Sequence, residues 1–127
     1  MSNYDAAKFE AAALAGDWRA AVAVLSRSAV RPEVLEALMI PDAHLEVVMG
    51  VLARQDVTPD HLAWAATFDN AQILSRVVAN PKTPVSLVQE IRDRAAGREQ
   101  AIWVHLREFA DRVLARSGQD SGLHGLV

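Results

Sequence analysis

The sequence contains no cysteine, which excludes disulfide bonds, thiolate metal ligands and cysteine nucleophiles. Long apolar stretches are missing as well. No run approaches the ~18 residues that a membrane-spanning helix needs, and the first residues lack the basic segment and apolar stretch of a signal peptide. We therefore expect a soluble protein of the cytoplasm that makes no contact with a membrane.

A strong charge of one sign is also missing. The net charge is −3, so the chain lacks the basic field that a general nucleic-acid-binding protein presents. Eleven basic residues are arginine and two are lysine, a bias that we interpret as the codon usage of a GC-rich bacterial genome. Aromatic residues make up only 6% of the chain, and Ala, Val and Leu supply most of the apolar share, which suits closely packed helices.

Sequence motifs of catalysis are absent too. The chain has no G-x-S-x-G element, no P-loop and no G-x-G-x-x-G. Its histidines never stand three to five residues apart, as metal-binding pairs on a helix do; they are His44, His61, His105 and His124. The carboxylates are scattered at helical spacing near arginines, which is typical of a solvated surface. We predict no catalytic residue, no metal site and no cofactor, with an enzyme of unrecognised site as an alternative.

Proline occurs only five times, and three of these prolines stand three residues before a leucine. The pairs are Pro32 with Leu35, Pro59 with Leu62, and Pro84 with Leu87. Proline suits the first position of a helix, because the N–H that it lacks would be unpaired there anyway. Thr58 and Thr83 directly precede two of these prolines and can accept a hydrogen bond from the first turn. Each pair therefore predicts the start of a helix.

Other helix ends are marked by short polar residues and glycine. Gly16 is expected to end the first helix, and Asp17 to cap the second. Asp42, and either Asp69 or Asn70, are expected to cap later helices.

Apolar residues recur with helical spacing along nearly the whole chain, which predicts an all-α protein of about eight short helices. The helices group into pairs with a period of 25 to 27 residues between successive prolines, as in helical-repeat proteins. Gly50 falls inside one helix, which indicates a close crossing of two helices. We predict a small α-solenoid in one domain, 1–117, made of a leading pair (1–29), repeat-like pairs (30–56, 57–81 and 82–117) and then a flexible tail (118–127).

The stretch Ala-Asn-Pro-Lys-Thr-Pro, 79–84, resembles the leucine-rich-variant repeat, in which Asn-Pro-x-Thr-Pro and a following leucine recur about every two dozen residues. Leu87 or Val88 occupies the leucine position. The preceding unit is a degraded copy with Gln55-Asp56 in place of Asn-Pro, and the first unit keeps only the proline and the leucine. The resemblance spans 30–96.

The resemblance implies a right-handed superhelix of short helices, similar to HEAT and armadillo stacks. Some members of this family carry an iron–sulfur segment, which a chain without cysteine lacks. The family supplies no catalytic residues that could be assigned to this sequence.

Aromatic side chains suggest where a partner could bind. His61, Trp64 and Phe68 lie at i, i+3 and i+7, so they share one face of a predicted helix. Packing in the core is one interpretation of this face. The other is a surface anchor for a protein or peptide, since exposed Trp and Phe concentrate binding energy. Trp103 presents the same two alternatives.

Arginines are concentrated in the last third of the chain, at Arg92, Arg94, Arg98, Arg107, Arg112 and Arg116. Acidic residues interleave with them, which favours a mixed charged face over a basic groove for nucleic-acid phosphates. We predict a non-enzymatic interaction module or adaptor for a protein or peptide partner, or for a second copy of itself. Nucleic-acid backbone binding through these arginines is the alternative.

Overall fold

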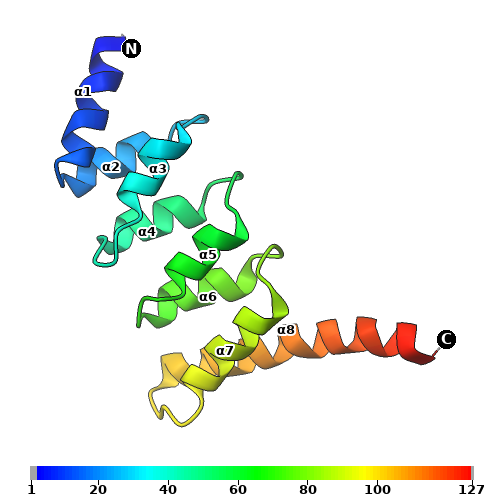
Figure 1. The fold of residues 1–127 in the computed structure, drawn as a ribbon. Coiled ribbons are helices and arrows are strands. Elements are labelled where there is room, and N and C mark those ends of the chain that lie inside the picture. Colours follow the sequence, from blue (N-terminus) through cyan, green and yellow to red (C-terminus); the bar gives the residue numbers. More distant parts are fainter. Residues whose placement is uncertain (1–2, 127) are drawn as a thin grey trace. The chain divides into compact units, whose positions relative to one another are not determined.

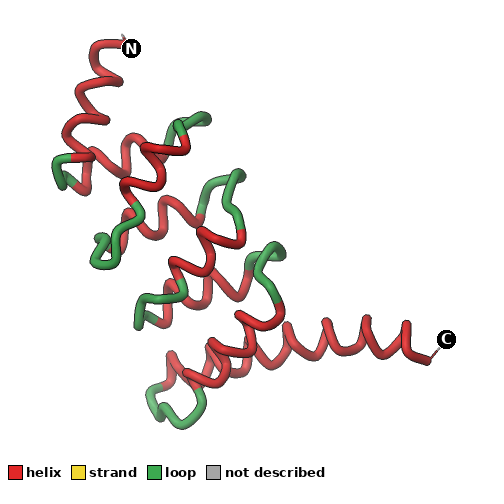
Figure 2. The backbone as a smooth tube through the Cα atoms, in the orientation of Figure 1, coloured by secondary structure: helices red, strands yellow, loops and turns green. Residues whose placement is uncertain are grey.

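The computed structural model describes residues 3–126, and within this range the regular structure consists of eight α-helices without a strand (Figures 1 and 2). The helices are α1 (Asn3–Leu14), α2 (Trp18–Leu25), α3 (Pro32–Leu38), α4 (Leu45–Leu52), α5 (Pro59–Ala65), α6 (Ala71–Ala79), α7 (Val85–Ala95) and α8 (Ala101–Leu126). The prediction of an all-α chain of about eight helices is confirmed.

The helices form two compact units, and the boundary lies between Trp64 and Ala65, inside α5. The predicted single domain, 1–117, has pair boundaries at 56/57 and 81/82, whereas the packing divides the chain inside the predicted pair 57–81. Trp64 donates a hydrogen bond from its indole Nε1 to the Ile40 carbonyl in unit 1 (3.1 Å). The residues after Trp64 are bound within unit 2.

The core of unit 1 comes from one face of each of α1 to α4. α1 packs on α2 and α3, and α2 packs on α4. Gly50 of α4 lies where α2 and α4 cross, since a Cβ atom at this position would stand 3.2 Å from Cδ1 of Leu25. This confirms the predicted close crossing. The buried core residues are Ala13, Ala20, Ala21, Val24, Leu25, Val34, Leu35, Leu38, Val47 and Val51.

Two of the predicted helix ends in unit 1 are confirmed. Gly16 adopts a φ of 107° after α1, a left-handed conformation that favours glycine. The Asp17 carboxylate accepts hydrogen bonds from the N–H groups of Arg19 and Ala20 (3.0 and 3.3 Å), which are unpaired donors of the first turn of α2.

The prediction that Asp42 caps α4 is wrong. α4 begins at Leu45, so Asp42 lies too far upstream, and His44 is the N-cap. Its Nδ1 accepts a hydrogen bond from the N–H of Glu46 (3.1 Å). The His44 ring also stacks on Trp18, with ring centroids 3.9 Å apart, so the same side chain ties the start of α4 to α2.

Thr58 acts at the start of α5 as predicted. Its hydroxyl accepts a hydrogen bond from the N–H of His61 (3.3 Å), and Nδ1 of His61 accepts one from the N–H of Thr58 (3.1 Å). This reciprocal arrangement is a capping box in which histidine takes the place of the usual glutamate.

Unit 2 is built from α6, α7 and α8, which pack on one another. α7 and α8 lie side by side in Figure 1. Asn70, rather than Asp69, caps α6, because its side chain accepts a hydrogen bond from the N–H of Ile73 (3.1 Å). The buried residues of these helices and of the segment before them are Ala65, Ala66, Ala71, Ile73, Leu74, Val77, Val78, Val88, Ile91, Ala95, Trp103, Leu106 and Ala110.

The joint between α6 and α7 is a turn. Asn80 is extended before Pro81, as proline requires of its neighbour, and its carbonyl accepts from the N–H of Thr83 (3.1 Å). The predicted cap at Thr83 is wrong, because its hydroxyl donates backward to the Val77 carbonyl at the end of α6 (2.5 Å). Pro84 is itself the N-cap of α7 and provides no side-chain acceptor.

The last helix is longer than predicted. α8 continues to Leu126, across nearly all of the segment 118–127 where a tail is expected; residue 127 lies outside the described range. This segment contains no proline, so every residue keeps the backbone N–H that a helix requires, and isolated glycines weaken a helix without breaking its hydrogen-bond ladder.

The close crossing at Gly50 leads to a stability prediction. Gly50→Ala should lower the free energy of unfolding by about 1 kcal/mol, because the cost of overpacking Leu25 exceeds the gain in helix propensity. In a Leu25→Val background, which removes Cδ1, the same change should become neutral or stabilising by up to about 1 kcal/mol. Urea unfolding followed by circular dichroism measures both steps. Stabilisation by Gly50→Ala with Leu25 present would contradict the close packing.

Candidate functional site

The aromatic residues predicted to bind a partner are largely used inside the protein. His61 and Trp64 belong to unit 1, where both are half-buried and bonded to backbone groups near α5. Phe68 and Trp103 belong to unit 2. Phe68 is half-buried, and Trp103 is only 6% exposed, with the Arg98 guanidinium 3.9 Å from its ring centroid. A partner surface composed of these four residues stays a prediction, and the structure favours packing roles for Trp64 and Trp103.

Three of the six C-terminal arginines have partners within unit 2. Arg92 binds Asp111 and Asp93, and the hydrogen bond that it donates to Asp111 raises the pKa of Arg92 above its already high ordinary value. Arg98 binds Asp69 at 2.9 Å. Arg94 donates to backbone carbonyl groups.

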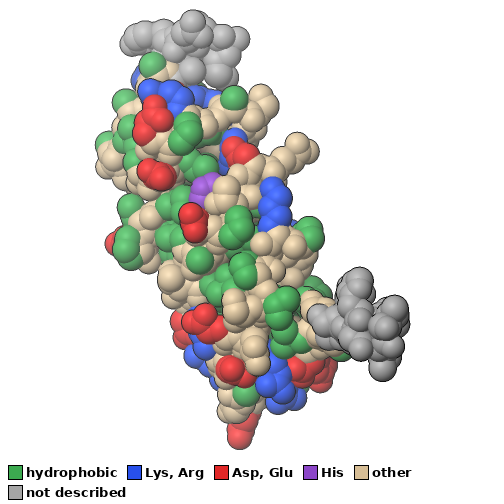
Figure 3. Space-filling view, turned by 45° about the vertical axis from the view of Figure 1, so that its right-hand side comes forward, with side chains coloured by type: hydrophobic (Ala, Val, Ile, Leu, Met, Phe, Trp, Pro, Cys, Tyr) green, Lys and Arg blue, Asp and Glu red, His purple; other side chains and the backbone are tan. Residues whose placement is uncertain are grey.

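The other three arginines, Arg107, Arg112 and Arg116, lie on α8. Arg112 lies 5.9 Å from the ring centroid of Phe109. In the lower part of Figure 3, where unit 2 lies, acidic and basic side chains alternate on the surface shown. The structure therefore distributes the six arginines over several environments rather than placing them in one basic face.

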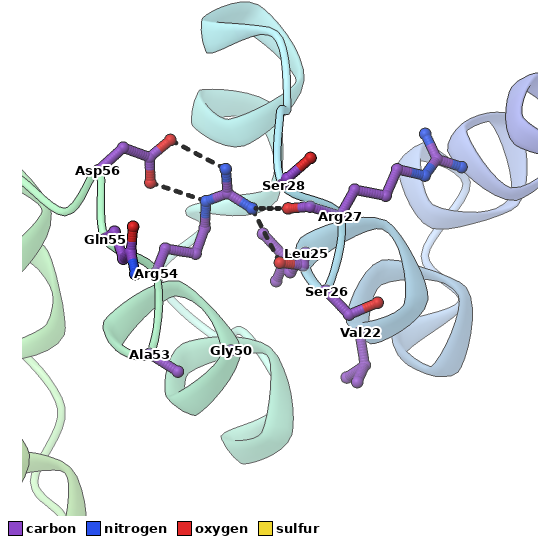
Figure 4. A pocket seen from close by; sticks show the side chains of 10 residues that line it. All are labelled: Val22, Leu25, Ser26, Arg27, Ser28, Gly50, Ala53, Arg54, Gln55 and Asp56. Atoms are coloured by element: carbon purple, nitrogen blue, oxygen red, sulfur yellow. Dashed lines mark hydrogen bonds and ion pairs between the residues drawn. The ribbon is translucent and has the colours of Figure 1, made fainter.

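Arg54 is the most completely bonded side chain of unit 1 and was not singled out by the sequence (Figure 4). It follows α4, and its side chain is 6% exposed. Nη1 donates to the carbonyl groups of Leu25, the last residue of α2, and Arg27, two residues later, both at 2.8 Å. Nε and Nη2 donate to the two oxygens of Asp56 at 2.8 and 2.9 Å.

This geometry assigns Arg54 a structural role. Carbonyl groups at the end of a helix have no partner within it, and Arg54 provides donors for two of them. The hydrogen bond from Arg54 is also the main reason that the pKa of Asp56 lies below its ordinary value. With its donors engaged, the guanidinium is not available as a cation for a ligand or a reacting group.

Arg94 repeats this arrangement in unit 2. It donates from Nη1 to the Ala66 carbonyl and from Nη2 to the Phe68 carbonyl (3.3 Å), just after α5, and lies 3.8 Å from Asp69. Each unit thus contains an arginine that binds two carbonyl groups, spaced two residues apart, beyond a helix end. In sequence both look like ordinary surface arginines, because the carbonyl groups that they bind lie 26 to 29 residues away.

A groove in unit 1 lies between the ends of α2 and α4 and has a volume of about 690 Å³ (Figure 4). Its apolar part is formed by Val22, Leu25, Gly50 and Ala53, and Arg54 with Asp56 closes one side. The remaining lining residues, Ser26, Arg27, Ser28 and Gln55, are polar. We call this the α2–α4 groove.

A second groove, of about 390 Å³, lies in unit 2 along α8. Eight of its twelve lining residues are apolar, polar atoms provide about half of its exposed lining surface, and the turn between α6 and α7 forms one end. We call it the α8 groove. Its lining consists of Val78, Ala79, Asn80, Pro81, Thr83, Val85, Val88, Phe109, Val113, Leu114, Arg116 and Ser117.

In the part of the chain that the structure describes, no three His, Asp or Glu side chains are placed to hold a metal ion. No helix of that part is both long and apolar enough to cross a membrane. No protein-family model matches the chain, and no curated protein and no solved structure shows significant similarity to it.

Removing the Arg54 guanidinium should strongly destabilise the protein. Arg54→Met leaves two helix-end carbonyl groups without donors, and we expect a loss of about 3 kcal/mol in the free energy of unfolding. Arg54→Lys should lose less stability than Arg54→Met, because the ammonium group retains the positive charge. It should still lose some, because one ammonium group cannot reach both carbonyl groups and Asp56 together. Lys8→Met, a similar change at an exposed position of unit 1, is the control and should stay within about 0.5 kcal/mol. Equal effects at the two positions would contradict the role of Arg54.

The lowered pKa of Asp56 predicts an acid-dependent contribution to stability. A carboxyl whose pKa is lower in the folded state stabilises the fold above its ordinary pKa of 3.8, and this contribution is lost as the pH falls through the lowered value. Wild type should therefore be more stable than Asp56→Asn at neutral pH, and the difference should shrink below pH 3.8. In an Arg54→Met background the difference should no longer depend on pH in this way. Urea midpoints across acidic pH values measure this.

Proposed function

We propose that the chain is a non-enzymatic interaction module of the cytoplasm that binds a peptide or a segment of another protein. The observation that carries the proposal is the α8 groove, a depression at the surface whose lining residues are mostly apolar and include one charged residue, Arg116. Val85 is 51% exposed at its edge, although it is a large apolar residue in the first turn of α7. Apolar surface of this kind gains free energy when a partner covers it.

The shape of the groove favours a chain segment as ligand. Its lining residues on α8 extend from Phe109 to Ser117, a stretch of nine residues that spans about 12 Å at 1.5 Å per residue. The pairing of short helices and the resemblance of 79–84 to the leucine-rich-variant repeat add support, since the turn 80–83 closes one end of this groove. In stacked helical repeats, surfaces formed by successive helices commonly bind proteins.

Nucleic-acid binding through the six arginines has less support. Arg92, Arg94 and Arg98 already donate to carboxylates or carbonyl groups of unit 2. Freeing them for phosphates would break those contacts. Titration with duplex DNA at low and high salt separates the two functions, because phosphate binding weakens steeply with salt while apolar burial does not.

Selection of peptides from a random display library against the full chain tests the proposal. Peptides that bind the α8 groove should bind the Val85→Asn variant at least about fivefold more weakly, since one apolar contact of the groove is replaced by an amide. Ile102→Asn is the matched control: Ile102 is 54% exposed, lies in the first turn of α8 and does not line the groove. Selected peptides should bind this variant as they bind wild type.

Two results would contradict the proposal. One is a selection in which no peptide sequence is enriched over a control without protein. The other is a set of bound peptides whose affinity is unaffected by Val85→Asn and by Val22→Asn, the corresponding change in the α2–α4 groove.

A further inference from the structure

The charges along the α8 groove have one sign. Of the residues that line it in the described part of the chain, Arg116 is the only charged one, and no carboxylate is among them. Arg116 is exposed, and no carboxylate pairs with it among residues 7–117, the range whose side chains the structure describes. One helical turn earlier, Arg112 lies 5.9 Å from the ring centroid of Phe109, which is itself part of the lining. Positive charge therefore stands at the groove in two places, on Arg116 in its lining and on Arg112 beside Phe109.

The contrast with the rest of unit 2 makes this distribution informative. Arg92 and Arg98, on the same unit, each bind an aspartate. Arg112 and Arg116 are exposed and have no such partner among the side chains of residues 7–117. A ligand in the groove would meet their positive charge at close range, where burial of the surrounding surface strengthens electrostatic interactions.

We propose that the α8 groove binds an acidic amphipathic helix of a partner protein. The apolar face of the partner helix would lie on Val85, Phe109 and Val113. Carboxylates of the same helix would pair with Arg112 and Arg116. This is the helix-in-groove mode of recognition, in which apolar side chains at i, i+3, i+4 and i+7 provide most of the affinity. The positive charges of Arg112 and Arg116 favour partner helices that carry negative charge. The inference rests on the proposed function and specifies its ligand.

Two labelled peptides test the inference by fluorescence anisotropy with the full chain. Both have about 14 residues and leucines at i, i+3, i+4 and i+7; their remaining positions are mainly Glu in one peptide and mainly Lys in the other. The Glu peptide should bind at least about fivefold more tightly at about 50 mM salt, and this ratio should fall toward one at about 500 mM salt. Val85→Asn should weaken the binding of the Glu peptide, whereas Ile102→Asn should not.

A charge reversal provides the most specific comparison. Arg116→Glu should weaken the Glu peptide and strengthen the Lys peptide, each by about threefold to tenfold. Arg107→Glu makes the same change on the same helix, and its position nine residues earlier, two and a half turns, is on the opposite face of α8. It should leave the preference between the peptides unchanged.

Each other outcome would overturn the inference. Equal binding of the two peptides, with a loss of both in Val85→Asn, would leave the proposed function intact but remove the preference for acidic partners. Equal effects of Arg116→Glu and Arg107→Glu would mean that the overall charge, not the groove, selects the peptide. Self-association that Val85→Asn abolishes, measured by sedimentation, would identify a second copy as the occupant. Binding of neither peptide, alongside enriched display peptides that require the α2–α4 groove, would place the interaction in unit 1.

Discussion

The unpaired carbonyl groups at helix ends are the constraint on which the rest of this structure depends. Six of the eight helices have 11 residues or fewer, so end groups make up a large share of their backbone, and an end buried without a donor is costly. Arg54 and Arg94 meet this requirement by binding two carbonyl groups each, from residues distant in the sequence. Thr83 does the same locally, by donating to Val77.

The same contacts shape the surfaces on which function depends. Arg54 uses four of its five N–H donors within unit 1, and its ion pair with Asp56 forms one wall of the α2–α4 groove. In unit 2, Thr83 faces back toward α6, and the turn that it stabilises closes one end of the α8 groove. Arginines that bind helix ends or aspartates direct their N–H donors to groups of the protein and not to a partner. Arg112 and Arg116 do not make such contacts among the described side chains, and they give the α8 groove a positive charge.

Local features of the fold could be predicted from the sequence, because they depend on neighbours along the chain. The all-α class, the end of α1 at Gly16, the caps at Asp17 and Thr58 and the close crossing at Gly50 all follow from residue spacing and are present in the structure. The caps assigned to Asp42 and Thr83 failed for local reasons as well. A histidine can cap a helix through Nδ1, and a threonine hydroxyl before a proline can bond either forward or backward.

The candidate site, in contrast, was decided by tertiary structure. Periodicity places Trp64 and Trp103 on helical faces but does not say that an indole N–H will bind the Ile40 carbonyl or that a guanidinium will cover the second ring. Similarly, all six C-terminal arginines look alike in sequence, and only packing separates those with partners from those beside the groove. The sequence by itself determined the helices and most of their ends, because hydrogen bonds within a helix and its caps join residues a few positions apart. The tertiary structure alone decided which charges and apolar side chains remain available to a partner, because that depends on groups brought together from more than twenty residues away.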